Sequence, residues 1–229
     1  MSSDTSTRGH ATLRASAALA FLSGFAVMVL EIVGTRLLAR DFGSSFYVWT
    51  SQIGVVLVAL SLGYVAGGVW ADRFQHGRFL SWFLAPAAAF TALIPEFAGG
   101  VMARIVGRHP VEFEIPLLWQ KLDPAIGAAL VFLPPCFVLA MLPPYLIRLS
   151  ARSVGHVGRV SGMVYGAGSI GSIAGVFTSG YLLIDLFRLT HIFHGTGVLI
   201  AFLAIACWRL RGPVAVSVTP AGRPASEHA

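Results

Sequence analysis

The sequence predicts an all-α integral membrane protein, built as a bundle of six transmembrane helices. Of its 229 residues, 56% are hydrophobic and only 11% are charged, whereas soluble domains carry about 25% charged residues. The mean hydropathy is correspondingly high, at +0.77. The apolar residues also gather in six long runs, and a spanning helix needs about 20 such residues.

The six runs have clear limits at most of their ends. They lie at residues 15–38, within 42–71, at 79–95, within 124–147, within 160–184 and within 189–208. The length of the third is left open, because residues 97–106 either extend it or form a short interfacial segment. Residues 1–14 and 210–229 lack apolar periodicity, and we expect disordered cytoplasmic tails on either side of a transmembrane domain at 15–209.

Basic residues are distributed unevenly between the two sides of the predicted bundle. Six spans put both termini on one side, and that side holds ten of the sixteen Lys and Arg residues but three of the ten acidic ones. The positive-inside rule therefore predicts cytoplasmic termini. We expect the protein in the inner (cytoplasmic) membrane. The net charge of +6 fits this bias and contact with the lipid bilayer. Nucleic-acid binding is not expected.

Two ionisable residues lie near the end of the first span. Glu31 and Arg36 are five residues apart, about 140° around a helix, so they are poor partners for each other. Each needs a partner elsewhere, because charges at membrane depth are costly. In one interpretation Arg36 extends to the interface and Glu31 is a buried structural acceptor. In the other, Glu31 and Arg36 contact a ligand or ion.

Charged residues follow the second span as Asp72, Arg73 and Arg78. This segment is similar to the cytoplasmic loop after the second helix of major facilitator transporters, with two extra residues between Arg73 and Gly77. We expect a charge latch in which Asp72 pairs with an arginine of a neighbouring helix. Its role is either structural or a part of conformational gating.

Four prolines interrupt the fourth span: Pro134, Pro135, Pro143 and Pro144. Proline lacks a backbone donor, so it leaves carbonyl groups that must find other partners or line a cavity. Broken helices are where transporters place binding sites. A kink that only improves packing is the alternative.

Glycines in the second and fifth spans predict close helix packing. The pairs Gly63–Gly67 and Gly171–Gly175 are each four residues apart, and this spacing lets helix backbones approach closely. The fifth span also matches G-x-G-x-x-G, but a dinucleotide site needs a preceding strand, so this match is rejected. Tyr165 and Ser169 offer polar groups on neighbouring turns and are candidate ligand contacts.

Metal and catalytic sites are not expected in this chain. His191 and His194 have a spacing that suits a metal on one helix face, but no Cys, Asp or Glu lies close to them in sequence, and interfacial histidines are the better interpretation. No nucleophile and base pair up in sequence. We therefore expect no catalytic residue, no cofactor and no activity of this chain alone.

Three stretches together resemble one family. They are residues 24–36 with the Glu-x-x-x-x-Arg core, Phe42-Gly43-Ser44-Ser45, and residues 162–184 with their Gly and Ser pattern. They are similar to the membrane half of the spermidine synthase-like proteins, also called fused major-facilitator/spermidine synthase proteins. The resemblance covers about residues 18–196 and implies half of a major facilitator fold.

The resemblance implies a partner as well as a fold. In that family a cytoplasmic aminopropyltransferase-like domain typically follows the membrane domain, and its catalytic carboxylates are not found here. The resemblance therefore implies a module that scaffolds a separate soluble aminopropyltransferase-like protein in polyamine chemistry. The alternative is a dimeric half-transporter, in which two copies surround a pathway for a small polar solute.

Overall fold

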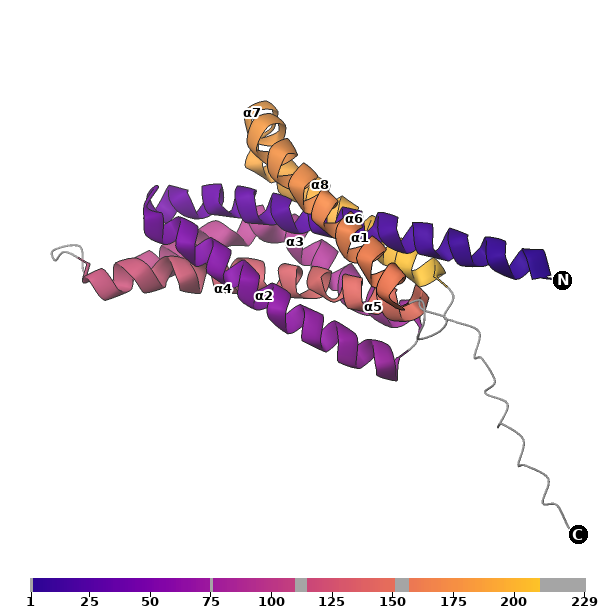
Figure 1. Cartoon of the computed structure of the whole chain (residues 1–229). Helices are drawn as coiled ribbons and strands as arrows, with labels where there is room; N and C mark the ends of the chain where they lie inside the picture. The colour runs from indigo at the N-terminus through magenta and orange to yellow at the C-terminus, as the bar shows by residue number, and fades with distance from the viewer. Residues whose placement is uncertain (1, 75, 110–114, 151–156, 211–229) are drawn as a thin grey trace, which may run out of the picture.

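A computed structural model describes residues 2–74, 76–109, 115–150 and 157–210, and the side chains from residue 13 onward. The described part is helical, without strands (Figure 1). Its elements are α1 (Ser2–Phe42), α2 (Phe46–Arg73), α3 (Gly77–Val106), α4 (Leu117–Ala140), α5 (Leu142–Ser150), α6 (Val157–Thr178), a π-helical turn η2 (Ser179–Leu183), α7 (Ile184–Leu186) and α8 (Leu189–Arg209).

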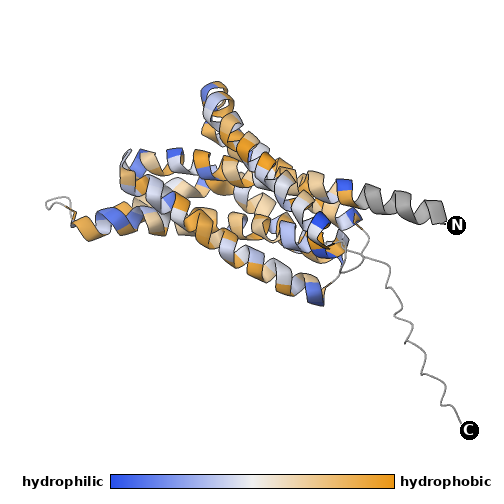
Figure 2. Cartoon of the chain, viewed as in Figure 1, coloured by the Kyte–Doolittle hydropathy of each residue, from blue (hydrophilic) through white to orange (hydrophobic). Residues whose placement is uncertain are grey.

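Six helical segments are long and apolar enough to cross a membrane, so the predicted six-span, multi-pass class is confirmed at that level. The segments are Leu13–Phe42, Phe46–Arg73, Gly77–Val106, Leu117–Ser150, Val157–Leu186 and Leu189–Arg209. The third continues through residues 97–106 as one helix, despite Pro86 and Pro95 within it. Apolar residues dominate the middle of the bundle, and hydrophilic ones gather toward its ends (Figure 2).

The N-terminal region differs from its prediction. The backbone is helical from Ser2 onward, continuous with the first span, whereas the sequence predicts a disordered tail over residues 1–14. Once a helix is nucleated, each further residue adds a hydrogen bond at little cost, and this segment contains no proline. In the predicted C-terminal tail, residues 211–229 lie outside the described residues.

Three helix pairs make the most extensive contacts: α1 with α6, α2 with α4, and α3 with α8. The first three spans are α1, α2 and α3, and the last three are α4–α5, α6–α7 and α8. If each of the first three is exchanged for its counterpart in the last three, the α1–α6 pair becomes the α4–α2 pair and the α3–α8 pair becomes itself. The same exchange also interchanges the α1–α8 and α3–α4 contacts. The packing thus has an internal two-fold pattern that relates two groups of three spans.

Glycines lie where the paired helices approach most closely. A Cβ atom at Gly171 or Gly175 would collide with the backbone of α1 at Phe21 or Phe25. At Gly63 and Gly67 it would collide with the backbone of the fourth span, at Phe137 and Met141 respectively. All four glycines of the two predicted pairs therefore lie at helix crossings that leave no room for a side chain.

We expect Gly171→Ala to destabilise the protein by about 1–3 kcal/mol, because the added methyl group must push α6 away from α1. Gly166→Ala is the matched control on the same helix, since its Cβ would meet nothing within 4 Å. That change should be neutral or stabilising by about 0.5–1 kcal/mol, the usual helix preference for alanine over glycine. Thermal unfolding in detergent measures both, and equal effects would contradict the packing role of Gly171.

Candidate functional site

A small polar cavity of about 100 Å³ lies between α1, α2, α6 and the α4–α5 break. Residues from all four elements form its walls: Ala20, Ser23, Gly24, Val27, Met28, Leu60, Tyr64, Leu139, Ala140, Pro143, Val164, Tyr165, Gly168, Ser169 and Ser172. The cavity combines five hydroxyl groups with apolar walls. It includes Tyr165 and Ser169, two of the residues predicted as ligand contacts.

The break in the fourth span builds one wall of this cavity. The helix continues through Pro134 and Pro135 and is interrupted at Met141, just before Pro143 and Pro144. The predicted broken helix is therefore present at the second proline pair, while the first pair lies inside α4. An isolated proline pair is tolerated in a membrane helix when neighbouring groups satisfy the freed carbonyls.

A serine of α1 satisfies one carbonyl that the break sets free. Pro143 has no N–H to donate to the oxygen of Leu139, four residues earlier. The buried hydroxyl of Ser23 donates to that oxygen at 2.9 Å. Leu139, Pro143 and Ser23 all line the polar cavity, so the hydrogen bond joins the break to α1. Ser23 carries no distinctive sequence signal that would mark it for this role.

Two tyrosines lie at the mouth of the polar cavity. Tyr64 of α2 and Tyr165 of α6 meet edge to face, with ring centroids 6.4 Å apart. They are 39% and 46% exposed, so they belong to the outer surface of this chain as well as to the cavity. Ser169 is also exposed, one turn further along α6. The cavity therefore opens between α2 and α6.

Glu31 lies on the cavity side of α1. It follows Val27 and Met28, which line the cavity, by four and three residues, and so lies one turn further along the same helix face. Its side chain is half-buried. No hydrogen bond or ion pair of its carboxylate is found within the described residues.

A second buried polar side chain occupies the same level of the bundle. Gln52 of α2 is completely buried, and its amide nitrogen is 3.5 Å from the backbone oxygen of Leu30. Its amide oxygen has no partner among the described residues. Buried polar groups are usually paired, whereas Gln52 and the half-buried Glu31 are two incompletely satisfied groups near one turn of α1.

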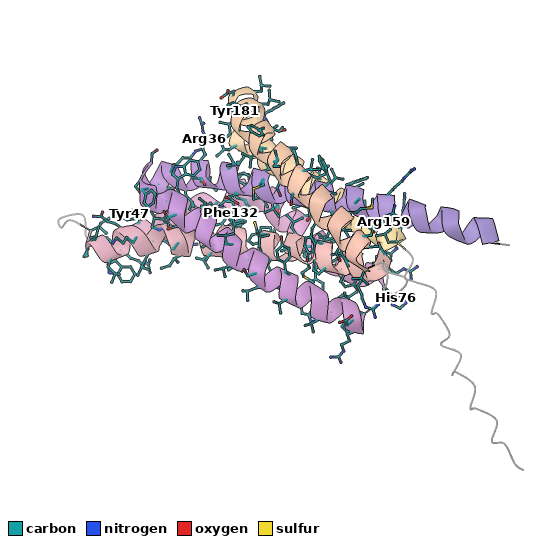
Figure 3. The ribbon with its side chains drawn as sticks, in the orientation of Figure 1. Arg36, Tyr47, His76, Phe132, Arg159 and Tyr181 are labelled. Carbon is teal, nitrogen blue, oxygen red and sulfur yellow. The ribbon has the colours of Figure 1, made fainter. Side chains whose placement is uncertain are left out.

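Arg36 does not share the environment of Glu31. It is exposed and projects from α1 on the side where α7 lies (Figure 3). It lies seven residues, or two turns, after Val29 and therefore on the same face of α1. Val29 is not among the residues that line the cavity. The structure thus separates the two ionisable residues of the first span, as their spacing predicts, and Arg36 is not part of the polar cavity.

Only one of the three residues of the predicted charge latch, Asp72, forms the expected ion pair. Asp72 accepts a hydrogen bond from Arg148 of α5 at 2.7 Å, which is the expected arginine on a neighbouring helix. Arg73 and Arg78 instead lie over the aromatic rings of Phe74 and Trp208. The Asp72 side chain is 72% exposed, and such exposed pairs contribute little stability.

Tyr145 of α5 is the stronger contact at this turn. It is completely buried, and its hydroxyl group contacts the backbone oxygens of Phe74 and His76, the latter at 3.0 Å. Phe79 stacks on both Phe74 and Tyr145. The broken fourth span therefore holds the α2–α3 turn through a buried phenol, which sequence analysis missed because Tyr145 lies in an ordinary apolar run.

We expect Tyr145→Phe to leave two carbonyls of the α2–α3 turn without their donor, at a cost of about 1–3 kcal/mol. The turn should then open more often, and Arg73 and Arg78 flank it as trypsin sites. Tryptic cleavage at these two arginines should accelerate in Tyr145→Phe and not in the control Tyr165→Phe. Unchanged cleavage would show that Tyr145 does not hold the turn.

A buried carboxylate organises the opposite end of the bundle. Asp123 near the start of α4 is 4% exposed, and its two oxygens lie 3.0 Å from Arg108 Nη2 and 2.6 Å from His109 Nε2. Arg108 also lies over the ring of Trp119. These contacts tie the end of α3 to the start of α4.

We expect Asp123→Asn to lower stability by about 2 kcal/mol, because it weakens hydrogen bonds to two donors at a buried position. Asp72→Asn is the matched control, since its ion pair is exposed, and it should change stability by less than about 0.5 kcal/mol. Thermal unfolding of both variants in one detergent gives the comparison. A larger loss of stability in Asp72→Asn than in Asp123→Asn would contradict the greater contribution of the buried Asp123 contacts.

Metal ligation receives no support from the histidines. His194 pairs with Glu96 at 3.4 Å, with both side chains about half exposed, and His191 is exposed. Within the described residues, no group of three or more His, Cys, Asp or Glu side chains is placed to hold a metal. Cys136 and Cys207 are buried and unpaired.

Comparisons with protein-family models, with curated proteins and with solved structures found no match for this chain.

Proposed function

We propose that this protein is a membrane-embedded solute-binding module that works as one half of a transporter, with a second copy completing the pathway. The observation that carries this proposal is the half-buried carboxylate of Glu31 beside an open, hydroxyl-lined cavity. Ionisable groups at membrane depth are costly, face the bundle interior or a water-filled cavity, and mark substrate or ion pathways.

The cavity of a single chain is too small to act alone. Its volume of about 100 Å³ compares with about 300–1,000 Å³ for typical ligand pockets, and two exposed tyrosines form its mouth. A second wall facing Tyr64 and Tyr165 would enlarge and close it. The half-transporter proposal supplies that wall from another copy.

The helix packing supports the same proposal. The contacts repeat when the first three spans are exchanged for the last three. Each six-helix half of major facilitator transporters is built from two such groups of three, related by an inverted repeat. In this arrangement the half-buried face with Glu31 lies between α2 and α6, whose apolar side chains remain largely exposed, among them Val65, Val69, Ile173 and Phe177.

The solute class follows from the charges at the cavity. One carboxylate, two tyrosine rings and three serines line or adjoin it, and no Lys or Arg belongs to its walls. A carboxylate and aromatic faces attract cations. We therefore propose a small polar solute that carries an amine, which also agrees with the polyamine chemistry that the family resemblance implies.

Scaffolding of a soluble partner is the second candidate function. Exposed arginines surround the end of the bundle at which α8 ends and α2 meets α3: Arg14, Arg73, Arg78, Arg159 and Arg209. In Figure 3, Arg159 and His76 mark this end. A positive rim suits an acidic face of a soluble partner, and an aminopropyltransferase-like protein is the partner that the resemblance implies.

The test of the transporter proposal is uptake by proteoliposomes that contain the purified protein. Radiolabelled putrescine serves as the diamine probe and succinate as the anionic comparison. We expect putrescine uptake that falls at least about tenfold in Glu31→Gln, because the carboxylate that attracts the amine is gone. Glu96→Gln is the matched control, since Glu96 is exposed and pairs with His194 outside the cavity.

The mass of the protein in mild detergent distinguishes the two candidates. The half-transporter predicts a dimer, whereas the scaffold predicts a soluble protein that co-purifies in stoichiometric amount from native membranes. Uptake that is unchanged in Glu31→Gln would contradict the role of Glu31. A monomer without uptake, together with a co-purifying soluble protein, would favour the scaffold.

A further inference from the structure

A second, larger groove lies on another side of α1. It has a volume of about 450 Å³ and is formed by Phe25 and Val29 of α1, Leu183 and Phe187 around the π-helical turn, and Ile192 and Leu199 of α8. Its walls are almost entirely apolar. Phe25 and Val29 lie on a different face of α1 from Gly24 and Val27 of the polar cavity, so the groove and the cavity are separate.

Basic side chains lie at one end of this groove. Arg36 follows Val29 by two helical turns on the same face of α1, and Arg188 precedes the groove residue Ile192 by one turn. Both arginines are exposed, as is His191, which lines the groove. Within the described residues neither arginine forms an ion pair. Asp185 of α7 is the acid nearest to Arg188 in sequence, and the rim remains positive.

The length of the groove corresponds to one leaflet of a bilayer. From His191 to Leu199 there are eight residues, or about 12 Å along α8, and half of the hydrocarbon core is about 15 Å thick. The basic end lies at the end of the spans, where α1 and the π-helical turn approach the membrane surface. A molecule in this groove is therefore apolar over about one leaflet and meets positive charge at the interface.

We propose that the groove binds one anionic phospholipid, with an acyl chain along Phe25, Val29 and Leu199 and its phosphate between Arg36 and Arg188. The charge pattern selects this occupant. An apolar helix of a partner would leave both arginines unpaired, whereas a phosphate at the level of the headgroups neutralises them. Arginine guanidinium groups bind phosphate through charge-assisted hydrogen bonds. This proposal is independent of the proposed solute pathway.

The structure offers a variant that fills the groove without disturbing the bundle. Gly195 lines the groove, and a Cβ atom there would meet nothing within 4 Å, so Gly195→Leu places a side chain in the space of the acyl chain. Gly99→Leu is the matched control on α3, because a Cβ at Gly99 also meets nothing within 4 Å. A second pair of variants, Arg36→Gln and Arg188→Gln, tests whether these two arginines bind the phosphate of the headgroup.

The experiment is native mass spectrometry of the delipidated protein titrated with phosphatidylglycerol or phosphatidylcholine of the same acyl chains. We expect one phosphatidylglycerol to bind in preference to phosphatidylcholine. Each arginine variant should weaken phosphatidylglycerol binding about fivefold, the equivalent of about 1 kcal/mol per basic residue near a membrane surface. Gly195→Leu should weaken binding of both lipids, and Gly99→Leu should weaken neither.

Three results would overturn the proposal. The first is equal binding of both lipids, and the second is phosphatidylglycerol binding that survives in Gly195→Leu. The third is a dimer that Gly195→Leu dissociates, which would assign the groove to a second copy of the chain. The first two results do not bear on uptake through the Glu31 cavity, because the groove and the cavity use different faces of α1. The third would place the dimer contact at the groove rather than at the mouth formed by Tyr64 and Tyr165, and so would also contradict the half-transporter arrangement.

Discussion

Close approach of helix backbones is the constraint on which the rest of this structure depends. Lipid tails are as apolar as the side chains that they contact, so membrane helices associate through tight packing rather than through the hydrophobic effect. Here α1 meets α6 at Gly171 and Gly175, and α2 meets the fourth span at Gly63 and Gly67. These crossings place α1 and α4 inside and leave α2 and α6 with open faces.

The second requirement is that backbone groups inside a membrane find partners within the protein. The break before Pro143 violates the helical pattern, and Ser23 compensates for it by donating to the freed oxygen of Leu139. Tyr145, just after the break, uses its hydroxyl at the α2–α3 turn. One interruption of the fourth span thus forms a cavity wall and also fixes a neighbouring turn.

Two polar groups that the fold does not fully satisfy lie near one level of α1. Glu31 is half-buried without a partner among the described residues, and the amide oxygen of Gln52 is buried and unpaired. By contrast, Asp123 has two donors and serves structure. This difference between satisfied and unsatisfied polar groups is what separates a candidate site from a structural tie in the same bundle.

The sequence by itself determined the class of the protein, the six spans and the glycine crossings, because length, hydropathy and small-residue spacing act locally along each helix. It also located Glu31, Tyr165, Ser169 and the proline break as exceptional. Only the tertiary structure decided which of these come together: Tyr165, Ser169 and Pro143 share a cavity beside Glu31, while Arg36 lies apart. Ser23, Gln52, Tyr145 and Arg148 escaped the sequence analysis, because their roles depend on partners 22 to 116 residues away. Residue spacing within one helix carries no information about such partners, which helix packing alone brings into contact.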